Sequence, residues 1–256
     1  MTDELKRRVR TLVRSTAKES GICTVEMHDP EGRNAFSDRL VEQLRESLEG
    51  AASDPSVRVV VLLGLSDVFS SGAPRELLER LLRGEVAPTE IMLSKALLHV
   101  PVPTIAAMEG HATGGGLALG LCADIVLIAR ESRYGASFMN LGFTPGMGMT
   151  GLFEHVLSRA VAHELLYTGE FRRGSEFDGR SGFNYILPKA QIRAKAFDVA
   201  AQIADKPRVA LETLKRTLSV GRRQAFEQSR TIEAMMHTIS FSQDEVTRRI
   251  EEEYVE

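Results

Sequence analysis

Cysteine is scarce in this chain of 256 residues, which holds only Cys23 and Cys122. Both lie in apolar surroundings far apart in the sequence, so we expect buried free thiols of a cytoplasmic protein and neither a disulfide nor a metal site. No apolar run reaches the roughly 18 residues that a membrane span needs, and the N-terminal MTDELKRRVR lacks the apolar core of a signal peptide. The net charge of −3 argues against a general nucleic-acid-binding protein.

What is present is ordinary for a globular protein, with 43% hydrophobic and 26% charged residues. Residues 8–14 and 23–28 predict a strand hairpin, and residues 58–65, RVVVLLGL, are typical of a strand covered on both faces. Ser37 is placed to cap a helix. Helical spacing of apolar residues is found over residues 90–100, 151–166, 191–204, 208–218 and 224–254. We therefore expect an α/β core over residues 1–189, followed by a helical region over residues 190–256.

The most distinctive stretch is PVPTIAAMEGHATGGGLALGLCAD, residues 101–124. Residues 104–108 form a short apolar run typical of a buried strand, and Gly114, Gly115 and Gly116 then lead into an apolar helical segment. Consecutive glycines at such a junction let the backbone approach a ligand closely, and the first N–H groups of the helix can point at negative charge. From the glycines alone, a ligand site and a tight structural turn remain equally good interpretations.

Two other site types are disfavoured by what the sequence lacks. A nucleotide site at the glycines would need a Walker lysine or a dinucleotide fingerprint, and neither is present. Ser70 and Ser71 together with His237 suggest a serine hydrolase, but there is no G-x-S-x-G elbow and no defensible triad spacing.

Two paired features resemble the enoyl-CoA hydratase/isomerase (crotonase) superfamily: SSGA at residues 70–73 after a buried strand, and the block that begins at Pro101. The resemblance runs essentially from end to end. It implies a crotonase fold, a spiral of ββα units with a C-terminal helical trimerisation region. It also implies that the backbone N–H groups of Ala73 and Gly115 form an oxyanion hole for a thioester carbonyl oxygen. Two preorganised donors would stabilise an enolate more than the neutral ground state.

The departures from this family's pattern concern water addition. Its hydratases place two glutamates over the enoyl double bond, and the matching positions here are Ala118 and Phe138. Neither side chain can accept a proton. We therefore do not expect ordinary hydration, although the enolate-stabilising hole is kept.

A narrower resemblance points to the crotonase-like decarboxylases of polyketide β-branching cassettes. The segments that carry it are SSGAPRELLERLLRGEV (70–86), MNLGFTPGMGMT (139–150) and EAMMHTISFSQDEV (233–246). It implies decarboxylation of 3-methylglutaconyl on an acyl carrier protein, through a dienolate, to 3-methylcrotonyl or its β,γ-isomer. No cofactor is implied beyond the carrier's phosphopantetheine. His237 matches the histidine of these enzymes, and a group that titrates near neutrality suits protonation of a dienolate.

The main difference between this chain and these decarboxylases is at the position of the cation that binds the substrate carboxylate. Leu77 and Leu81 stand where related decarboxylases carry a tyrosine and a lysine, four and eight residues after Ala73. We expect both leucines, with Phe138, to shape the acyl pocket. Arg80 is a candidate cation, but one residue of offset turns a side chain by about 100° around a helix. It could hold the carboxylate only if this segment is irregular, and a solvated arginine is an equally good interpretation.

The resemblance also implies partners, namely the acyl carrier protein and a homotrimer, with a hexamer built as a dimer of trimers as a further possibility. Arg33 lies where the family grips the pantetheine end of the thioester, and a carrier contact and a solvated loop arginine are equally good interpretations of it. Two alternative functions stay open. One is a decarboxylase or isomerase of a small acyl-CoA, and the other is a non-catalytic, carrier-docking homologue.

Overall fold

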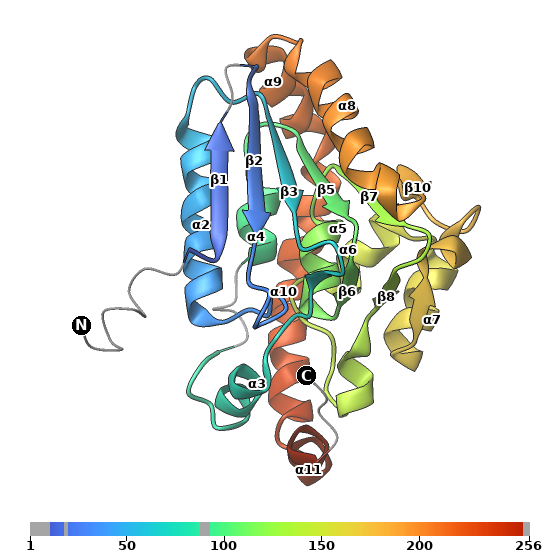
Figure 1. Cartoon of the computed structure of the whole chain (residues 1–256). Coiled ribbons are helices and arrows are strands. Elements are labelled where there is room, and N and C mark those ends of the chain that lie inside the picture. Colours follow the sequence, from blue (N-terminus) through green and yellow to red (C-terminus); the bar gives the residue numbers. More distant parts are fainter. Residues whose placement is uncertain (1–10, 18–19, 88–92, 253–256) are drawn as a thin grey trace.

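The computed structural model describes residues 11–17, 20–87 and 93–252. Its larger sheet has the strand order β1-β2-β3-β5-β7-β10 (Figure 1). The strands are β1 (Val13–Ala17), β2 (Ile22–Met27), β3 (Val59–Leu63), β5 (Thr104–Met108), β7 (Ile125–Ala129) and β10 (Tyr185–Leu187). β1 and β2 form the predicted antiparallel hairpin, although β1 begins later than expected, and the other pairs are parallel. Residues 8–10 of the predicted first strand lie outside the described residues.

A smaller sheet has the order β4-β6-β8-β9. Its strands are β4 (Val68–Ser70), β6 (His111–Thr113), β8 (Arg133–Gly135) and β9 (Phe171–Arg173). The chain alternates between the two sheets, so that β3 is followed by β4, β5 by β6 and β7 by β8. A helix follows each pair: α3 (Arg75–Leu82), α5 (Gly115–Leu121) and the 3₁₀ helix η2 (Ser137–Leu141). This repetition confirms the spiral of ββα units that the resemblance implied.

Strand β3, in the middle of the larger sheet, is buried on both faces, as the Val/Leu run over residues 58–65 predicted. Val59, Val61 and Leu63 of β3 pack with α8 (Ile192–Ala204), whereas Val60 and Leu62 join the core on the other side, with α2 (Asp38–Ser53). Ser37 caps α2, because its hydroxyl accepts a hydrogen bond from the Leu40 N–H. The helical region that begins at residue 190 therefore contributes to the core through α8, while the division at residues 189 and 190 stays a prediction.

Two of the predicted helices are divided. The apolar spacing over residues 151–166 corresponds to two helices, α6 (Met149–Val156) and α7 (Arg159–Thr168). A new helix begins at Arg159 because the Ser158 hydroxyl caps it by accepting a hydrogen bond from the Val161 N–H. The apolar spacing over residues 224–254 corresponds to two helices, α10 (Val220–Ser240) and α11 (Asp244–Glu252), and residues 253 and 254 lie outside the described residues. The remaining helices are α4 (Leu93–Leu98), η3 (Gly174–Phe177), η4 (Lys189–Gln191) and α9 (Arg208–Leu218). Residues 90–92 of the predicted helix before α4 lie outside the described part of the chain.

A buried ion cluster ties the C-terminal helices to the sheet. The Lys215 ammonium on α9 lies 2.8 Å from the Asp124 carboxylate and donates to the Val102 carbonyl at 2.9 Å. Arg222 on α10 binds the same carboxylate at 2.5 Å. Burial alone would raise the pKa of Asp124, but the two cations lower it. The cluster fixes the start of α10, whose other end lies near α3 and α11 (Figure 1). Within the described residues, no helix combines the length and apolar character of a membrane span.

Candidate active site

Two cavities meet beside the glycine loop that precedes α5. The outer cavity holds about 590 Å³ and the inner one about 50 Å³. The residues that line both are Ala73, Leu78, Gly115, Phe138 and Phe143. The two residues predicted to form the oxyanion hole therefore stand at the junction between a wide outer space and a narrow inner one.

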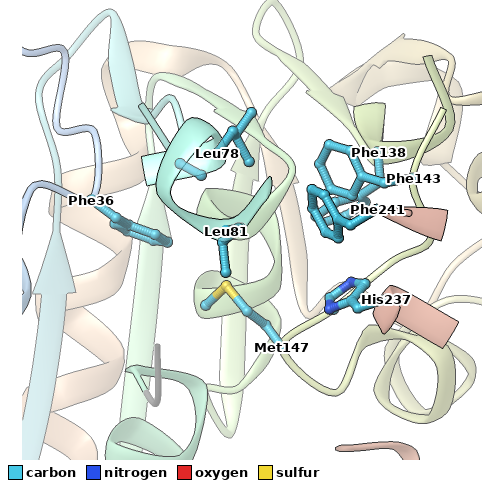
Figure 2. A pocket seen from close by; sticks show the side chains of 11 residues that line it. Phe36, Leu78, Leu81, Phe138, Phe143, Met147, His237 and Phe241 are labelled. Atoms are coloured by element: carbon cyan, nitrogen blue, oxygen red, sulfur yellow. The ribbon is translucent and has the colours of Figure 1, made fainter. Parts of the chain in front are cut away.

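The inner cavity is almost entirely apolar (Figure 2). It is lined by Phe36, Ala73, Leu78, Leu81, Gly115, Phe138, Phe143, Gly146, Met147, His237 and Phe241. In Figure 2 the His237 ring lies on the opposite side of the pocket from Phe36, with Leu81 and Met147 between them. Among these lining residues, His237 alone carries a polar side chain. The outer cavity has a more polar lining, which includes Glu31, Arg33, Ser71, Ser137 and Asn140.

Close backbone packing sets the positions of Ala73 and Gly115. Gly72 has a φ of +82°, and a Cβ on it would lie 2.8 Å from the Thr113 carbonyl oxygen and 3.2 Å from the Gly115 nitrogen. Its own carbonyl accepts a hydrogen bond of 2.7 Å from the Phe36 N–H. A glycine at 72 is thus needed for the two loops to approach each other, which brings residue 73 to the start of α5. Gly115, the first residue of α5, has its N–H in the turn that lacks intrahelical acceptors.

Asn34 holds in place the chain segments next to this junction. It is fully buried with a φ of +53°, and its amide donates to the carbonyls of Met27 and Phe69 at 3.2 and 2.9 Å. Ser70 donates to the Asn34 carbonyl at 2.7 Å and accepts from the Gly72 N–H at 3.2 Å. The Ser70 hydroxyl is therefore fully used in holding the loop, which agrees with rejecting it as a nucleophile.

The His237 ring is buried, with 7% of the residue exposed. Its Nε2 lies 2.8 Å from the Thr144 carbonyl oxygen, and its ring packs edge-on against Phe143 and Phe241. Nδ1 is buried and has no hydrogen-bond partner among the described residues. Burial lowers the pKa of the imidazole, against an opposing effect of the backbone carbonyls. Burial therefore favours the neutral form of the His237 imidazole.

Glu233 lies one helical turn before His237 on α10 and is also buried. Its carboxylate accepts hydrogen bonds from the Gly148 N–H at 2.7 Å, the Thr150 N–H at 2.9 Å and the Thr150 hydroxyl at 2.7 Å. Burial raises the pKa of Glu233, and these donors act in the opposite direction. The carboxylate holds the start of α6, and with it the loop over residues 143–148 that supplies the acceptor for His237.

Of the residues predicted from sequence, Ala73, Gly115, Leu81, Phe138 and His237 line the inner cavity together. Leu77 and Arg80 do not. Leu77 is buried in the hydrophobic core, and Leu78 takes its place in the cavity wall. The reason is that α3 begins only at Arg75, so a spacing counted from Ala73 is not a helical one.

The interpretation of Arg80 as the carboxylate's cation needs correction. Segment 75–82 is a regular helix, and the Arg80 guanidinium binds the Asp38 carboxylate at 2.8 and 3.0 Å. It is turned away from Leu81 by the geometry of the helix. Arg80 therefore belongs to a surface ion pair with the start of α2, and it is absent from the lining of both cavities.

Several pocket residues escaped the sequence reasoning. Phe36, Phe143 and Phe241 form much of the inner wall. Phe36 and Phe143 lie in segments without helical or strand periodicity, and Phe241 lies between α10 and α11, where the pattern over residues 224–254 is interrupted. Periodicity predicts which face of an element is buried, but it has no meaning in a loop. Only the aromatic and apolar character of the segment around residue 143 could have indicated a buried wall.

Comparison with known proteins gives a consistent family relationship. Residues 17–256 match the family model described as enoyl-CoA hydratase/isomerase. The bacillaene synthase decarboxylase PksI of Bacillus subtilis is 38% identical over 232 residues, which are 91% of this chain and 93% of that protein. A solved structure from a dehydratase/decarboxylase enzyme couple involved in polyketide β-branching superposes with a TM-score of 0.92 at 37% identity, over 96% of this chain and all of that one. The ECH2 decarboxylase domain of CurF from Lyngbya majuscula gives 0.89 at 37% identity, with the same coverage.

Proposed function

The chain belongs to the enoyl-CoA hydratase/isomerase family, and on that premise we propose that it is a decarboxylase of polyketide β-branching. As a carbon–carbon lyase, it converts 3-methylglutaconyl on an acyl carrier protein to 3-methylcrotonyl or its β,γ-isomer. The similarity to PksI and to the two β-branching decarboxylase structures supports this reaction class. The observation that carries the proposal is the inner cavity itself, which is apolar, holds His237, and opens past Ala73 and Gly115.

The site is unsuited to hydration. Phe138 occupies the wall of the inner cavity where the family's hydratases have a carboxylate, and Ala118 is buried in the core. Neither of these two described positions offers a general base to a water molecule over an enoyl double bond. The remaining chemistry is the formation and protonation of an enolate.

In the proposed reaction the thioester carbonyl lies at the cavity junction and the acyl chain occupies the inner cavity. When the carboxylate leaves as CO₂, its bonding electrons delocalise onto the thioester oxygen. The N–H groups of Ala73 and Gly115 stabilise that oxygen, and one such donor typically contributes on the order of 3 kcal/mol to lowering the barrier. His237, which lines the same cavity, then supplies the proton.

The outer cavity is the proposed path of the phosphopantetheine arm, and no other cofactor is required. Arg33 and Glu31 line this cavity together with Gly32. Arg33 is held in a left-handed conformation with a φ of +50° by the loop that Asn34 anchors. We assign Arg33 to the carrier's phosphate, because a guanidinium is well matched to phosphate oxygens.

We propose a homotrimer, with the C-terminal helices at its interfaces. Ile232, Met235 and Ile239 on α10 follow one helical stripe and are 56%, 66% and 68% exposed. Val209 and Leu218 on α9 are 75% and 72% exposed. Large apolar side chains left exposed on these two helices favour burial against another copy. Analytical ultracentrifugation distinguishes a trimer from a dimer of trimers and from a monomer.

The function is tested by mass spectrometry of a carrier protein loaded with 3-methylglutaconyl, with the CoA thioester run in parallel. We expect loss of CO₂ from the carrier-bound substrate, at a much higher kcat/KM than from the CoA form. Equal or faster turnover of the CoA form would favour a small acyl-CoA decarboxylase. Binding of the carrier without any loss of CO₂ would favour a non-catalytic docking protein.

A further inference from the structure

Met147 holds a backbone conformation that is unfavourable for a residue with a side chain. Its φ is +62°, in the left-handed region, and it lies between Gly146 and Gly148. Glycine adopts this region without strain, whereas a residue with a long side chain rarely does. A glycine at position 147 would relieve the loop of this strain. The strain therefore points to a role for the Met147 side chain.

That side chain packs against Gly115, whose N–H is one of the two proposed oxyanion donors. A Cβ built on Gly115 would lie 2.9 Å from Met147 Sδ and 2.9 Å from Phe36 Cε2. Met147 and Phe36 thus cover the backbone of Gly115 in the wall of the inner cavity. In a thioester whose oxygen accepts from the Gly115 N–H, C2 and C3 of the acyl group lie only two and three bonds from that oxygen. These carbons therefore come within reach of the Met147 thioether.

The inner cavity has little room to spare. Its volume of about 50 Å³ is space for about four groups of the size of a water molecule. The carbon chain of 3-methylglutaconyl and its methyl branch need at least this space. Figure 2 shows the Met147 side chain pointing toward Leu81, in the part of the pocket between Phe36 and His237. Met147 therefore occupies space that a larger branch would require.

The loop around Met147 is held by contacts that its side chain does not make. The Glu233 carboxylate accepts from the Gly148 N–H, and the Thr144 carbonyl lies against the His237 ring. Met147 packs against the edge of the hydrophobic core, whereas Phe36 is 1% exposed within it. A change of size at position 147 thus alters the cavity while these contacts remain.

We propose that Met147 is a specificity-determining residue, which limits the branch at C3 of the acyl group to about the size of a methyl group. This inference rests on the proposed decarboxylase function. A methionine is unbranched and fits closely around a small apolar group. A larger branch would have to displace a thioether that lies between the Gly115 backbone and the opposite wall. A misfit of one methylene in an apolar pocket changes kcat/KM by about 10- to 200-fold.

The test is a competition between 3-methylglutaconyl and 3-ethylglutaconyl, each loaded on the carrier protein and mixed in equal amounts. The two substrates share the same C4 and carboxylate, so only the branch differs. Mass spectrometry of the products gives the ratio of the two kcat/KM values, which does not depend on the fraction of active enzyme. We expect the wild type to prefer the methyl branch at least tenfold. Met147→Ala should bring the ratio to about one or reverse it, because the cavity is enlarged where the branch lies.

Further variants separate the size of the side chain from the strain of the backbone. Met147→Leu conserves the volume and should keep the wild-type ratio. Met147→Gly enlarges the cavity and removes the strain at a φ of +62°. It should relax the ratio as Met147→Ala does, and it serves in its place if the alanine variant does not fold. Met139→Ala is the matched control, because Met139 is 38% exposed and is absent from the lining of both cavities. It should keep the wild-type ratio.

The outcomes separate this inference from the function on which it rests. Equal use of both substrates by the wild type would overturn the size limit and leave the decarboxylase proposal standing. So would a wild-type ratio in Met147→Ala and Met147→Gly, or a ratio relaxed equally in Met139→Ala. If neither substrate loses CO₂, the proposed function fails. Calorimetry with the saturated 3-methylglutaryl and 3-ethylglutaryl pantetheine thioesters then tests the size limit by itself. A preference for the methyl analogue that Met147→Ala loses would support the limit, and equal affinities in the wild type would overturn it.

Discussion

Gly146 leaves the space that the His237 ring occupies. A Cβ at position 146 would lie 2.6 Å from Cε1 of that ring and 3.2 Å from Nε2, the nitrogen that donates to Thr144. The loop that carries Gly146 is in turn held by Glu233 through Gly148. The position of the proton donor is therefore set by the loop before α6 as well as by its own helix.

Gly146→Ala should displace the imidazole and lower kcat. A shift of about 1 Å in a catalytic group can reduce a rate by about 100-fold, and we expect an effect of that order. Steady-state decarboxylation of the carrier-bound substrate measures it. Gly50→Ala is the matched control, because no atom lies within 4 Å of the added Cβ, and its rate should equal that of the wild type. A wild-type kcat in Gly146→Ala would contradict the assigned position of His237.

Glu233→Gln should destabilise the protein and impair catalysis together. The carboxylate accepts three hydrogen bonds from Gly148 and Thr150, and an amide would turn a donor toward at least one of these donors. Loss of a hydrogen bond to a buried charged group costs roughly 1.5–3 kcal/mol in unfolding free energy. Urea denaturation measures this, and Glu227→Gln, at partly exposed ion pairs with Lys95 and Arg230, is the control on the same helix. Unchanged stability in Glu233→Gln would mean that the loop is held by other contacts.

The pH dependence of the rate should differ between free enzyme and complex. Catalysis needs protonated His237, whose pKa in the empty cavity is lowered by burial. Above about pH 6.5 the charged fraction falls tenfold per pH unit, so kcat/KM should fall with a slope near −1. In the complex the carboxylate raises the pKa, so kcat should stay level over the same range. A kcat/KM that is independent of pH between neutrality and mild alkali would count against the role of His237.

Leu81→Lys should supply the missing cation. Leu81 lines the inner cavity, so an ammonium there can reach a carboxylate bound near His237. We expect a lower KM for the carboxylate substrate and a weaker dependence of kcat/KM on pH, because the lysine is charged without proton uptake from neutral solution. Leu82→Lys, on the neighbouring position of α3 outside both cavity linings, is the control. If Leu81→Lys leaves the pH profile of kcat/KM unaltered, the carboxylate does not bind in this part of the cavity.

The sequence predicted the strands of the larger sheet well, because each strand carries a short apolar run. Residues 104–108, for example, form β5 as expected. The residues of the cavity junction, Ala73 and Gly115, were predicted from the resemblance to the crotonase superfamily, and the structure shows that Gly72 beside them is required by a close backbone approach. The apolar runs of the strands are local features, and local patterns are enough to predict them.

Prediction failed where the answer depends on contacts between distant segments. The start of α3 at Arg75, and not at Ala73, decides that Leu78 and not Leu77 faces the cavity. The partner of Arg80 is Asp38, more than forty positions away in the sequence. The capping hydroxyl of Ser158 divided a helix whose apolar spacing looked continuous. Periodicity does not contain such long-range pairings or exact helix starts.

The central claim is that this site generates a dienolate and protonates it, and does not add water. Decarboxylation of the carrier-bound substrate in D₂O, followed by NMR of the released acyl group, tests it most directly. The account predicts loss of CO₂ with a single deuterium in the product, either in the methyl group derived from C4 of 3-methylcrotonyl or at C2 of its β,γ-isomer. A hydrated product that retains its carboxylate would contradict the account as a whole.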